Sequence, residues 1–265
     1  MKNFLKIMII AATEIWLFAL CIQSAKAEDK ITLEDYLLWE FQASCQGTPQ
    51  ITKLPNGNVS LSAHSEPHNY CSIVIPSSGP NGIEHISKAI DDINQGNAAA
   101  GVELGAAAFN ARHYEVALKL YTMAAKQDSA NAQVLLGEMY SGGLGTAKDY
   151  TQALFWWHKA ADKGDATAQT HIGMAFHNGE GVTKNYEEAI KWWLKAANQP
   201  NVTLANTQAD HYLASAYKNG EGVAKDEEEA KKWEQKASKD ETEFWHKSWS
   251  TPIDDGHGHK LGIAR

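Results

Sequence analysis

The chain has 265 residues, of which 43% are hydrophobic and 21% charged, so it is long enough and apolar enough to bury a core. Its formal net charge is -8 at pH 7. Nucleic-acid affinity depends on Lys and Arg side chains that neutralise phosphates, and the sequence has no basic stripe, so a nucleic-acid-binding protein is disfavoured. An acidic surface accommodates a basic or neutral partner more easily.

The first 27 residues have the three parts of a secretory signal peptide. Lys2 and Lys6 precede an apolar run over residues 7–22, and the small-residue motif Ala-Lys-Ala ends at Ala27. We expect cleavage after Ala27, a periplasmic or secreted protein, and no stable membrane insertion afterwards. An uncleaved membrane anchor is the alternative, because about sixteen apolar residues approach the length of a membrane-spanning helix.

Cleavage would leave two cysteines, Cys45 and Cys71. Two cysteines in an exported chain are more often bridged than free, so we predict a disulfide between them. It would close a loop of about 27 residues and contribute roughly 3 to 4 kcal/mol in the chain-entropy model. Two unpaired buried thiols are the alternative. Lipid attachment at Cys21 is disfavoured because the bulky Leu20 precedes it.

Residues 28–80 are predicted to form a small α+β domain that the disulfide helps to hold. Apolar residues at helical spacing predict a helix over Thr32–Ser44, with Thr32 as a possible cap. Three apolar segments then predict strands at residues 51–54, 59–63 and 70–75. The turn sequence Pro-Asn-Gly-Asn at residues 55–58 makes the first two strands a hairpin.

Residues 81–243 are organised by an internal repeat. The triplet Lys159-Ala160-Ala161 recurs at offsets of 36 and 41 residues, and glycine, alanine, tyrosine and tryptophan positions keep the same two offsets. The five extra residues of the longer offset fall in the loop-like stretch 199–204. We expect a half repeat over residues 83–97 and four helix pairs over residues 98–131, 132–167, 168–208 and 209–243.

The second repeat shows the expected unit, with helices over Ala132–Gly142 and Tyr150–Lys163. Glycines 143 and 145 would form the turn between them. Gly137 and Gly173 lie in mid-helix, where glycine costs about 1 kcal/mol relative to alanine, so a close packing contact must offset that cost. The bulky side chains expected to supply the contact are Trp156, Trp157, Trp192 and Trp193.

The pattern A-x-x-x-L-G-x-x-Y-x-x-G-x-G-V, followed by A-x-x-W-x-x-K-A-A, resembles the Sel-1-like repeat of the tetratricopeptide superfamily. The resemblance covers about residues 98–240 and implies an all-α, right-handed solenoid of helix pairs behind the small α+β domain. Thr146 and Ala214 depart from the pattern, and the first unit is shortened. Glu234 replaces the second aromatic residue of the last unit, which is typical of a terminal repeat.

The carboxyl-terminal segment, residues 244–265, contains Phe244, Trp245 and Trp249, which we expect to cap the last repeat. Beyond about residue 252 we expect disorder.

The sequence contains no metalloprotease helix motif, P-loop, dinucleotide fingerprint or nucleophile elbow. Two histidine pairs, His64 with His68 and His257 with His259, supply too few ligands for a zinc site, so no metal or cofactor is predicted. The resemblance links cysteine-rich family members to cell-wall or β-lactam hydrolysis. Here the repeats contain no cysteine, which favours a protein that is not an enzyme.

In stacked helix pairs of this family, the first helix of each pair lines the concave side, where partners usually bind. By resemblance to tetratricopeptide groove positions, the exposed partner-binding set is Val134, Glu138, Ser141, Thr170, Met174, His177, His211, Ser215 and Lys218. This mixed set suits a protein or peptide partner, although the positions could equally be merely solvated. Two binding roles stay open: a periplasmic adaptor or scaffold, and an immunity protein that neutralises a secreted antibacterial toxin.

Overall fold

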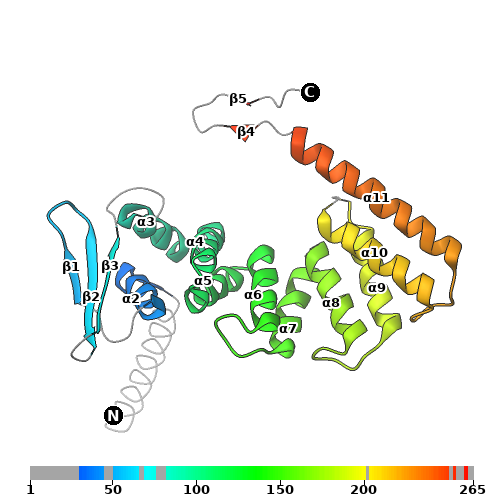
Figure 1. The fold of residues 1–265 in the computed structure, drawn as a ribbon, viewed down its shortest axis with the longest axis horizontal. Coiled ribbons are helices and arrows are strands. Elements are labelled where there is room, and N and C mark those ends of the chain that lie inside the picture. The colour runs from blue at the N-terminus through cyan, green and yellow to red at the C-terminus, as the bar shows by residue number, and fades with distance from the viewer. Residues whose placement is uncertain are drawn as a thin grey trace, which may run out of the picture. The chain divides into compact units, whose positions relative to one another are not determined.

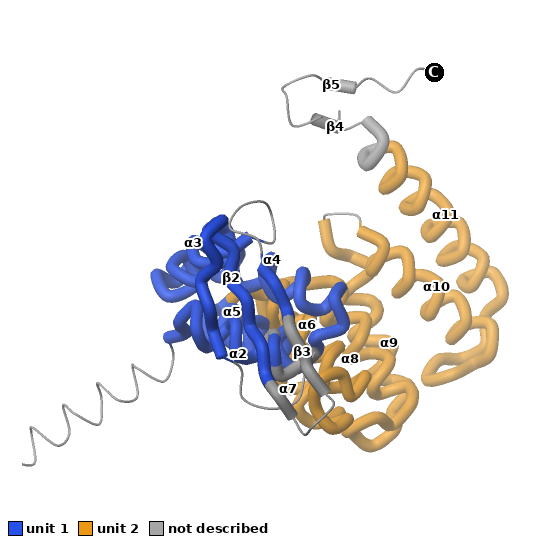
Figure 2. Tube along the Cα trace, turned by 60° about the vertical axis from the view of Figure 1, so that its left-hand side comes forward, with its two compact units in different colours: residues 1–128 blue, residues 129–265 orange. Residues whose placement is uncertain are grey.

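A computed structural model describes residues 30–44, 50–65, 69–75, 82–200, 203–250, 253–254 and 260–261. The predicted signal peptide, Cys45, His68, His257 and His259 lie outside these residues, so the predicted cleavage and disulfide stay predictions. No helix among the described residues combines the length and the apolar character needed to cross a membrane. The chain divides into two compact units, residues 1–128 and 129–265 (Figure 2).

The amino-terminal unit begins with helix α2 (Leu33–Ser44), which confirms the predicted helix. Its start is fixed by a reciprocal cap. The Thr32 hydroxyl accepts the Asp35 N–H at 3.1 Å, and the Asp35 carboxylate accepts the Thr32 N–H at 2.9 Å. Leu37 and Phe41 are fully buried one turn apart, so one face of α2 faces a core.

Three antiparallel strands follow in the order β1-β2-β3 (Figure 1). They are β1 (Gln50–Lys53), β2 (Val59–Ser65) and β3 (Asn69–Ile75), which confirms the predicted hairpin and third strand. Gly57 adopts φ 83° in the hairpin turn, a conformation that favours glycine. Val59, Leu61 and Ala63 are buried in alternation along β2, so one face of the sheet is covered.

The same unit ends in three helices, α3 (Ile83–Asn94), α4 (Ala98–Asn110) and α5 (Tyr114–Lys126). The side chain of Asn94 holds the start of the domain to α3, because it accepts the Ile31 N–H at 3.0 Å and donates to the Ile31 carbonyl at 2.7 Å. Helices α4 and α5 pack as a pair, with Gly105 against the ring of Tyr121. This pair corresponds to the shortened first repeat.

The carboxyl-terminal unit contains three further helix pairs (Figure 1). Their members are α6 (Ala130–Gly142) with α7 (Tyr150–Ala161), α8 (Ala166–Asn178) with α9 (Tyr186–Ala197), and α10 (Leu204–Asn219) with α11 (Glu227–Ser250). Contacts of α7 with α8, of α9 with α10 and of α8 with α10 stack successive pairs. The short strands β4 (Ile253–Asp254) and β5 (Lys260–Leu261) pair near the chain end. The helical repeat architecture is therefore confirmed for this unit.

Each first helix of these pairs ends at a glycine in the left-handed region: Gly143, Gly179 and Gly220 have φ of 70°, 77° and 74°. The second glycine of the turn also has a positive φ, 73° at both Gly181 and Gly222, and it makes a close contact in addition. A Cβ on Gly181 would lie 2.8 Å from the Cβ of Tyr150 in the preceding repeat. The same contact joins Gly222 to Tyr186. Each of these turns therefore docks on the second helix of the repeat before it.

The five extra residues between the third and fourth repeats are divided between loop and helix. Six residues separate α9 from α10, against four between α7 and α8, and α10 has 16 residues where α8 has 13. Two extra residues therefore lengthen the loop, and three lengthen α10. The expectation that all five form a loop is wrong for Leu204, because Thr203 and Asn206 form a capping box that starts the helix there.

The predicted contact between glycine and tryptophan exists, but one tryptophan of each pair makes it. Gly137 packs against the indole of Trp157 and Gly173 against that of Trp193, and both indoles are buried. Trp156 and Trp192 are only partly buried and do not make the contact, so the expectation that they share it is wrong. Their positions, one residue earlier on the helix, point about 100° away from the glycine.

Candidate partner-binding surface

Three positions recur on the first helices α6, α8 and α10 and define what we call the first-helix face. They lie two residues before, one after and four after the mid-helix glycine or alanine, a helical spacing that places them on one side. All nine residues at these positions are partly or fully exposed. The nine residues are Leu135, Glu138, Ser141, His171, Met174, His177, Tyr212, Ser215 and Lys218.

Two residues of the predicted binding set are buried, so their predicted exposure is wrong. Val134 is 6% exposed and belongs to a core cluster with Ala168 and Ile172 of the next repeat. Thr170 is 1% exposed, and its hydroxyl donates to the carbonyl of Ala205 on α10 at 3.2 Å. The position three residues before the glycine therefore packs one first helix against the next.

His211 occupies the same position in the last repeat, yet it is exposed. No further repeat packs on α10 within the described part of the chain, and the His211 Nε2 lies 3.7 Å from a carboxylate oxygen of Glu241 on α11. The remaining predicted residues, from Glu138 to Lys218, belong to the first-helix face. Whether they bind a partner stays a prediction.

Contacts between neighbouring helices order the first-helix face. The His171 Nε2 on α8 lies 3.3 Å from the Glu138 carboxylate on α6, and the imidazole stacks on Trp157 with centroids 4.7 Å apart. One repeat further, Tyr212 stacks on Trp193 at 4.9 Å. In each case a ring of the face lies flat on the tryptophan that packs against the mid-helix glycine.

Contacts with neighbouring elements also order Met174 and His177 of the first-helix face. The Tyr212 hydroxyl lies 3.3 Å from the Met174 sulfur. His177 is bracketed by acceptors, with its Nε2 3.1 Å from the Glu221 carboxylate and its Nδ1 3.0 Å from the Asn178 side-chain oxygen. These contacts tie α8 to α10 and to the turn that follows α10. Five residues of the face, Glu138, His171, Met174, His177 and Tyr212, are thus held by contacts with neighbouring helices or turns.

Leu135, His171 and Tyr212 were missing from the predicted binding set. All three stand two residues before the mid-helix position, and a large side chain recurs there in three successive repeats. That recurrence was a usable sequence signal. The transferred tetratricopeptide positions did not include it.

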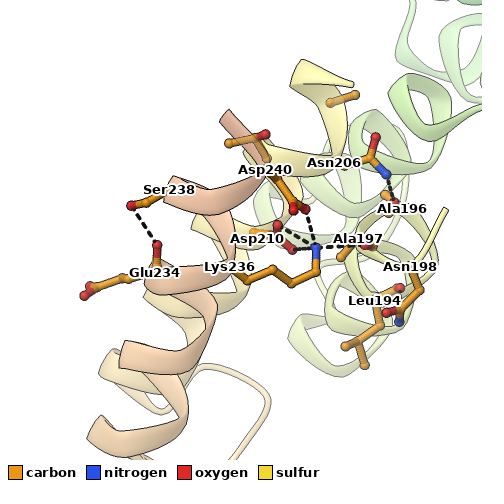
Figure 3. A network of polar contacts seen from close by, with 12 residues as sticks. Leu194, Ala196, Ala197, Asn198, Asn206, Asp210, Glu234, Lys236, Ser238 and Asp240 are labelled. Atoms are coloured by element: carbon orange, nitrogen blue, oxygen red, sulfur yellow. Dashed lines mark hydrogen bonds and ion pairs between the residues drawn. The ribbon is translucent and has the colours of Figure 1, made fainter. Parts of the chain in front are cut away.

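A separate polar cluster joins the last two helices (Figure 3). The Lys236 ammonium on α11 donates to both oxygens of Asp210 on α10, at 3.0 and 2.8 Å, and to Asp240 at 2.8 Å. It also donates to the Ala197 carbonyl at the end of α9, at 3.0 Å. Burial raises the pKa of Asp210 to about 6, and Lys236 limits that rise.

The amino-terminal unit holds an open groove of about 510 Å³ between α2 and α5. It is lined by apolar side chains together with Lys30, Asp35 and Trp39, and the Lys119 ammonium lies 4.6 Å from the centre of the Trp39 ring. Within the described residues, no three His, Cys, Asp or Glu side chains come together to hold a metal ion.

Comparison with known proteins identifies the repeats. The model of the Sel1 repeat matches residues 112–129, 130–165, 166–201 and 207–240. No curated protein matches the chain.

Two solved structures are similar. One is a protective antigen of uropathogenic Escherichia coli strains with an SLR fold, 32% identical at a TM-score of 0.53 over 58% of this chain and 33% of that one. The other is a Sel1 repeat protein from Oxalobacter formigenes, 29% identical at a TM-score of 0.52 over 59% of this chain and 64% of that one. This chain thus aligns with a third of the first protein and just under two thirds of the second. Together with the observed helix pairs, the four matches show that this chain carries an array of Sel1 repeats over residues 112–240.

Proposed function

We propose that this protein is an exported, non-catalytic scaffold that binds a partner protein through the first-helix face of its Sel1 repeats. Sel1 repeats generally act as protein–protein interaction scaffolds. The signal-peptide pattern at residues 1–27 supports export to the periplasm or beyond. The non-catalytic part of the proposal rests on the lack of a catalytic motif in the sequence.

The order of the first-helix face is the observation that carries the proposal. Each partly exposed ring or carboxylate is held by a contact from the neighbouring repeat, as in the pairs Glu138–His171 and Met174–Tyr212. A surface that is ordered before binding loses less side-chain entropy when a partner docks, so more of the contact energy appears as affinity. Side chains that only contact water would not need neighbouring repeats to hold them in fixed positions.

The chemistry of the face favours a protein or peptide over a small charged metabolite. Glu138 and Lys218 supply opposite charges at separate repeats, while Met174 and Tyr212 supply polarizable and aromatic surface between them. A small ligand would need convergent polar groups around one cavity. Here the polar groups are spread over three helices.

Site-specific photo-crosslinking in the periplasm tests the proposal. A photoreactive amino acid at Ser215, on the first-helix face, should give a discrete crosslinked protein. The same amino acid at Lys191, exposed on the second helix α9, is the matched control. The triple variant Glu138→Ala, His177→Ala, Lys218→Ala should lose the Ser215 crosslink while keeping its thermal unfolding transition.

Crosslinks of equal yield from Ser215 and Lys191, or a crosslink that survives the triple variant, would contradict binding through this face. Export is tested separately by the mass of the mature protein. We expect an amino terminus at Glu28, and an intact amino terminus in the membrane fraction would instead support the anchor.

A further inference from the structure

The fourth repeat buries two carboxylates around one lysine. The Asp210 side chain is 0% exposed and that of Asp240 12% exposed, while the Lys236 ammonium contacts both at 2.8 Å. Lys236 also donates to the Ala197 carbonyl, so the ammonium joins α9, α10 and α11 (Figure 3). Two negative charges and one positive charge leave this buried cluster with an excess negative charge when all three groups are ionised.

In the second and third repeats, the first-helix residue at the position of Asp210 is uncharged. Gln133 and Gln169 stand four residues before the mid-helix glycine, where the last repeat has Asp210. Each reaches the residue 30 positions later: Gln133 accepts from Lys163 at 3.2 Å, and Gln169 accepts from Gln199 at 3.1 Å. The residue 30 positions after Asp210 is Asp240, so the last repeat places a second carboxylate there.

The lysine of the repeat also changes its role. Lys195, the equivalent of Lys236 in the third repeat, is exposed with its ammonium 3.8 Å from the centre of the Trp192 ring. In the fourth repeat the lysine bonds to the carboxylates, and its ammonium lies farther from the equivalent ring, 5.9 Å from the centre of Trp233. The cluster is therefore specific to the helix pair that ends the array, and its carboxylates face each other across the contact of α10 with α11.

The charged groups around Asp210 come from one neighbouring helix. Asp210 faces Lys236 and Asp240 of α11. The end of α9 contributes only a backbone group, the Ala197 carbonyl, to the cluster. On α10 itself, the adjacent His211 is directed to Glu241 and not to Asp210. No charged side chain of α8 takes part in the described contacts of the cluster. A protonated Asp210 would remove the excess charge and could donate to Asp240, while Lys236 would keep its bond to Asp240.

We propose that the Asp210–Asp240 pair is a proton-dependent fastening of the carboxyl-terminal helix, which takes up one proton in mildly acidic surroundings and then holds α11 more firmly against α10. The sign follows from the direction of the shift. Because the pKa of Asp210 is raised from 3.8 to about 6 in the folded chain, protons bind the folded state more tightly than the unfolded one. This contribution to stability is absent well above pH 6 and grows as the pH falls.

Chemical unfolding of the full chain between pH 7.5 and pH 5 tests the proposal, with Asp210→Asn as the variant. Asparagine mimics the protonated carboxyl and restores the amide of the earlier repeats. Relative to that of the variant, the folding equilibrium constant of the wild type should rise about tenfold between pH 7.5 and pH 5. The lower limit, pH 5, lies about one pH unit below the pKa of Asp210 in the folded chain, and each such unit corresponds to a factor of ten. Glu234→Gln is the matched control, since it removes one negative charge from an exposed position of α11, outside the cluster.

Amide hydrogen exchange of the wild type shows which helices change in stability with pH. It also tests the proposal without the variant, in case Asp210→Asn folds poorly. The protection factors of α11 in the wild type should rise several-fold from pH 7.5 to pH 5, while those of α6 and α7 stay level. A stability difference between wild type and Asp210→Asn that does not change with pH would overturn the proposal. So would equal changes in protection across α6, α7 and α11.

Discussion

The third and fourth repeats are both helix pairs, but they differ in the side chains that pack between the two helices. In the third repeat Gly173 on α8 packs against the buried indole of Trp193 on α9. In the fourth repeat the corresponding residues are Ala214, which is buried, and Glu234, which is exposed. The glycine and the large ring are thus present together or absent together, which shows that the glycine exists to make room for the ring.

The pairs also differ in polarity. Within the described residues, the third repeat is followed by another helix pair, and the fourth is not. Helix α9 is covered by α10, whereas the outer side of α11 carries polar residues such as Lys231, Glu234 and Gln235. Repeat arrays need such a polar terminal side to remain soluble. The difference teaches that single positions set the packing and polarity of a helix pair, here one whose helices are also longer than those of the pair before it.

The largest effect expected from this comparison is that of Trp193→Ala. The indole is 2% exposed, stacks on Tyr212 and donates to the Thr170 carbonyl at 3.3 Å. Its removal should lower the free energy of unfolding by about 3 to 5 kcal/mol in urea titration. Glu234→Ala, at the equivalent exposed position, should change it by less than about 0.5 kcal/mol. Similar losses in the two variants would refute the distinction between an internal and a terminal repeat.

A second difference should separate the two lysines. Lys236→Ala leaves the buried Asp210 without its cation and should cost about 2 to 3 kcal/mol at pH 7.5, a loss that shrinks toward pH 5 as Asp210 becomes neutral. Lys195→Ala loses an exposed cation–π contact and should cost less than about 1 kcal/mol at either pH. Thermal unfolding at the two pH values measures both. A pH-independent loss for Lys236→Ala would argue that the lysine acts only through packing.

The smallest effects concern the small residues themselves. Gly173→Ala should destabilise by about 1 to 3 kcal/mol despite the better helix propensity of alanine, because the added methyl group collides with Trp193. Ala214→Gly should cost about 1 kcal/mol, through backbone entropy. Adding Trp193→Phe to Gly173→Ala should recover part of the loss. The absence of any recovery would show that the ring is not what the glycine accommodates.

The sequence was sufficient to predict the repeat architecture because the units share several fixed positions. Coincident offsets of glycine, alanine and tryptophan placed the helix pairs, and the predicted helix over Ala132–Gly142 differs from α6 by two residues at its start. Capping and turn chemistry are local, so Thr32 and the turn at Gly57 could also be predicted. The Sel1 repeat matches agree with the resemblance.

Contacts between repeats were harder to predict. Trp156 and Trp157 both follow Ala153 at helical spacing, and their roles depend on how the second helix is rotated against the first. The first and fourth repeats indicate which tryptophan packs against the glycine. At the position of Trp157, the first repeat has Tyr121, which packs against Gly105, and the fourth repeat has Glu234, where the glycine is also absent. The burial of Thr170 could not be predicted in this way, since it depends on the approach of α10 to α8.

The docking of each turn on the preceding repeat has a consequence for how such a chain can change in length. Gly181 packs against the Cβ and backbone of Tyr150, and Gly222 against those of Tyr186, so a repeat copied by gene duplication finds the same receiving helix start at an internal junction. The nearest atoms are the Cβ and the backbone, which every residue other than glycine offers, so the contact does not require a tyrosine at the receiving position. New repeats can therefore be accepted within the array without a matching change in the receiving side chain.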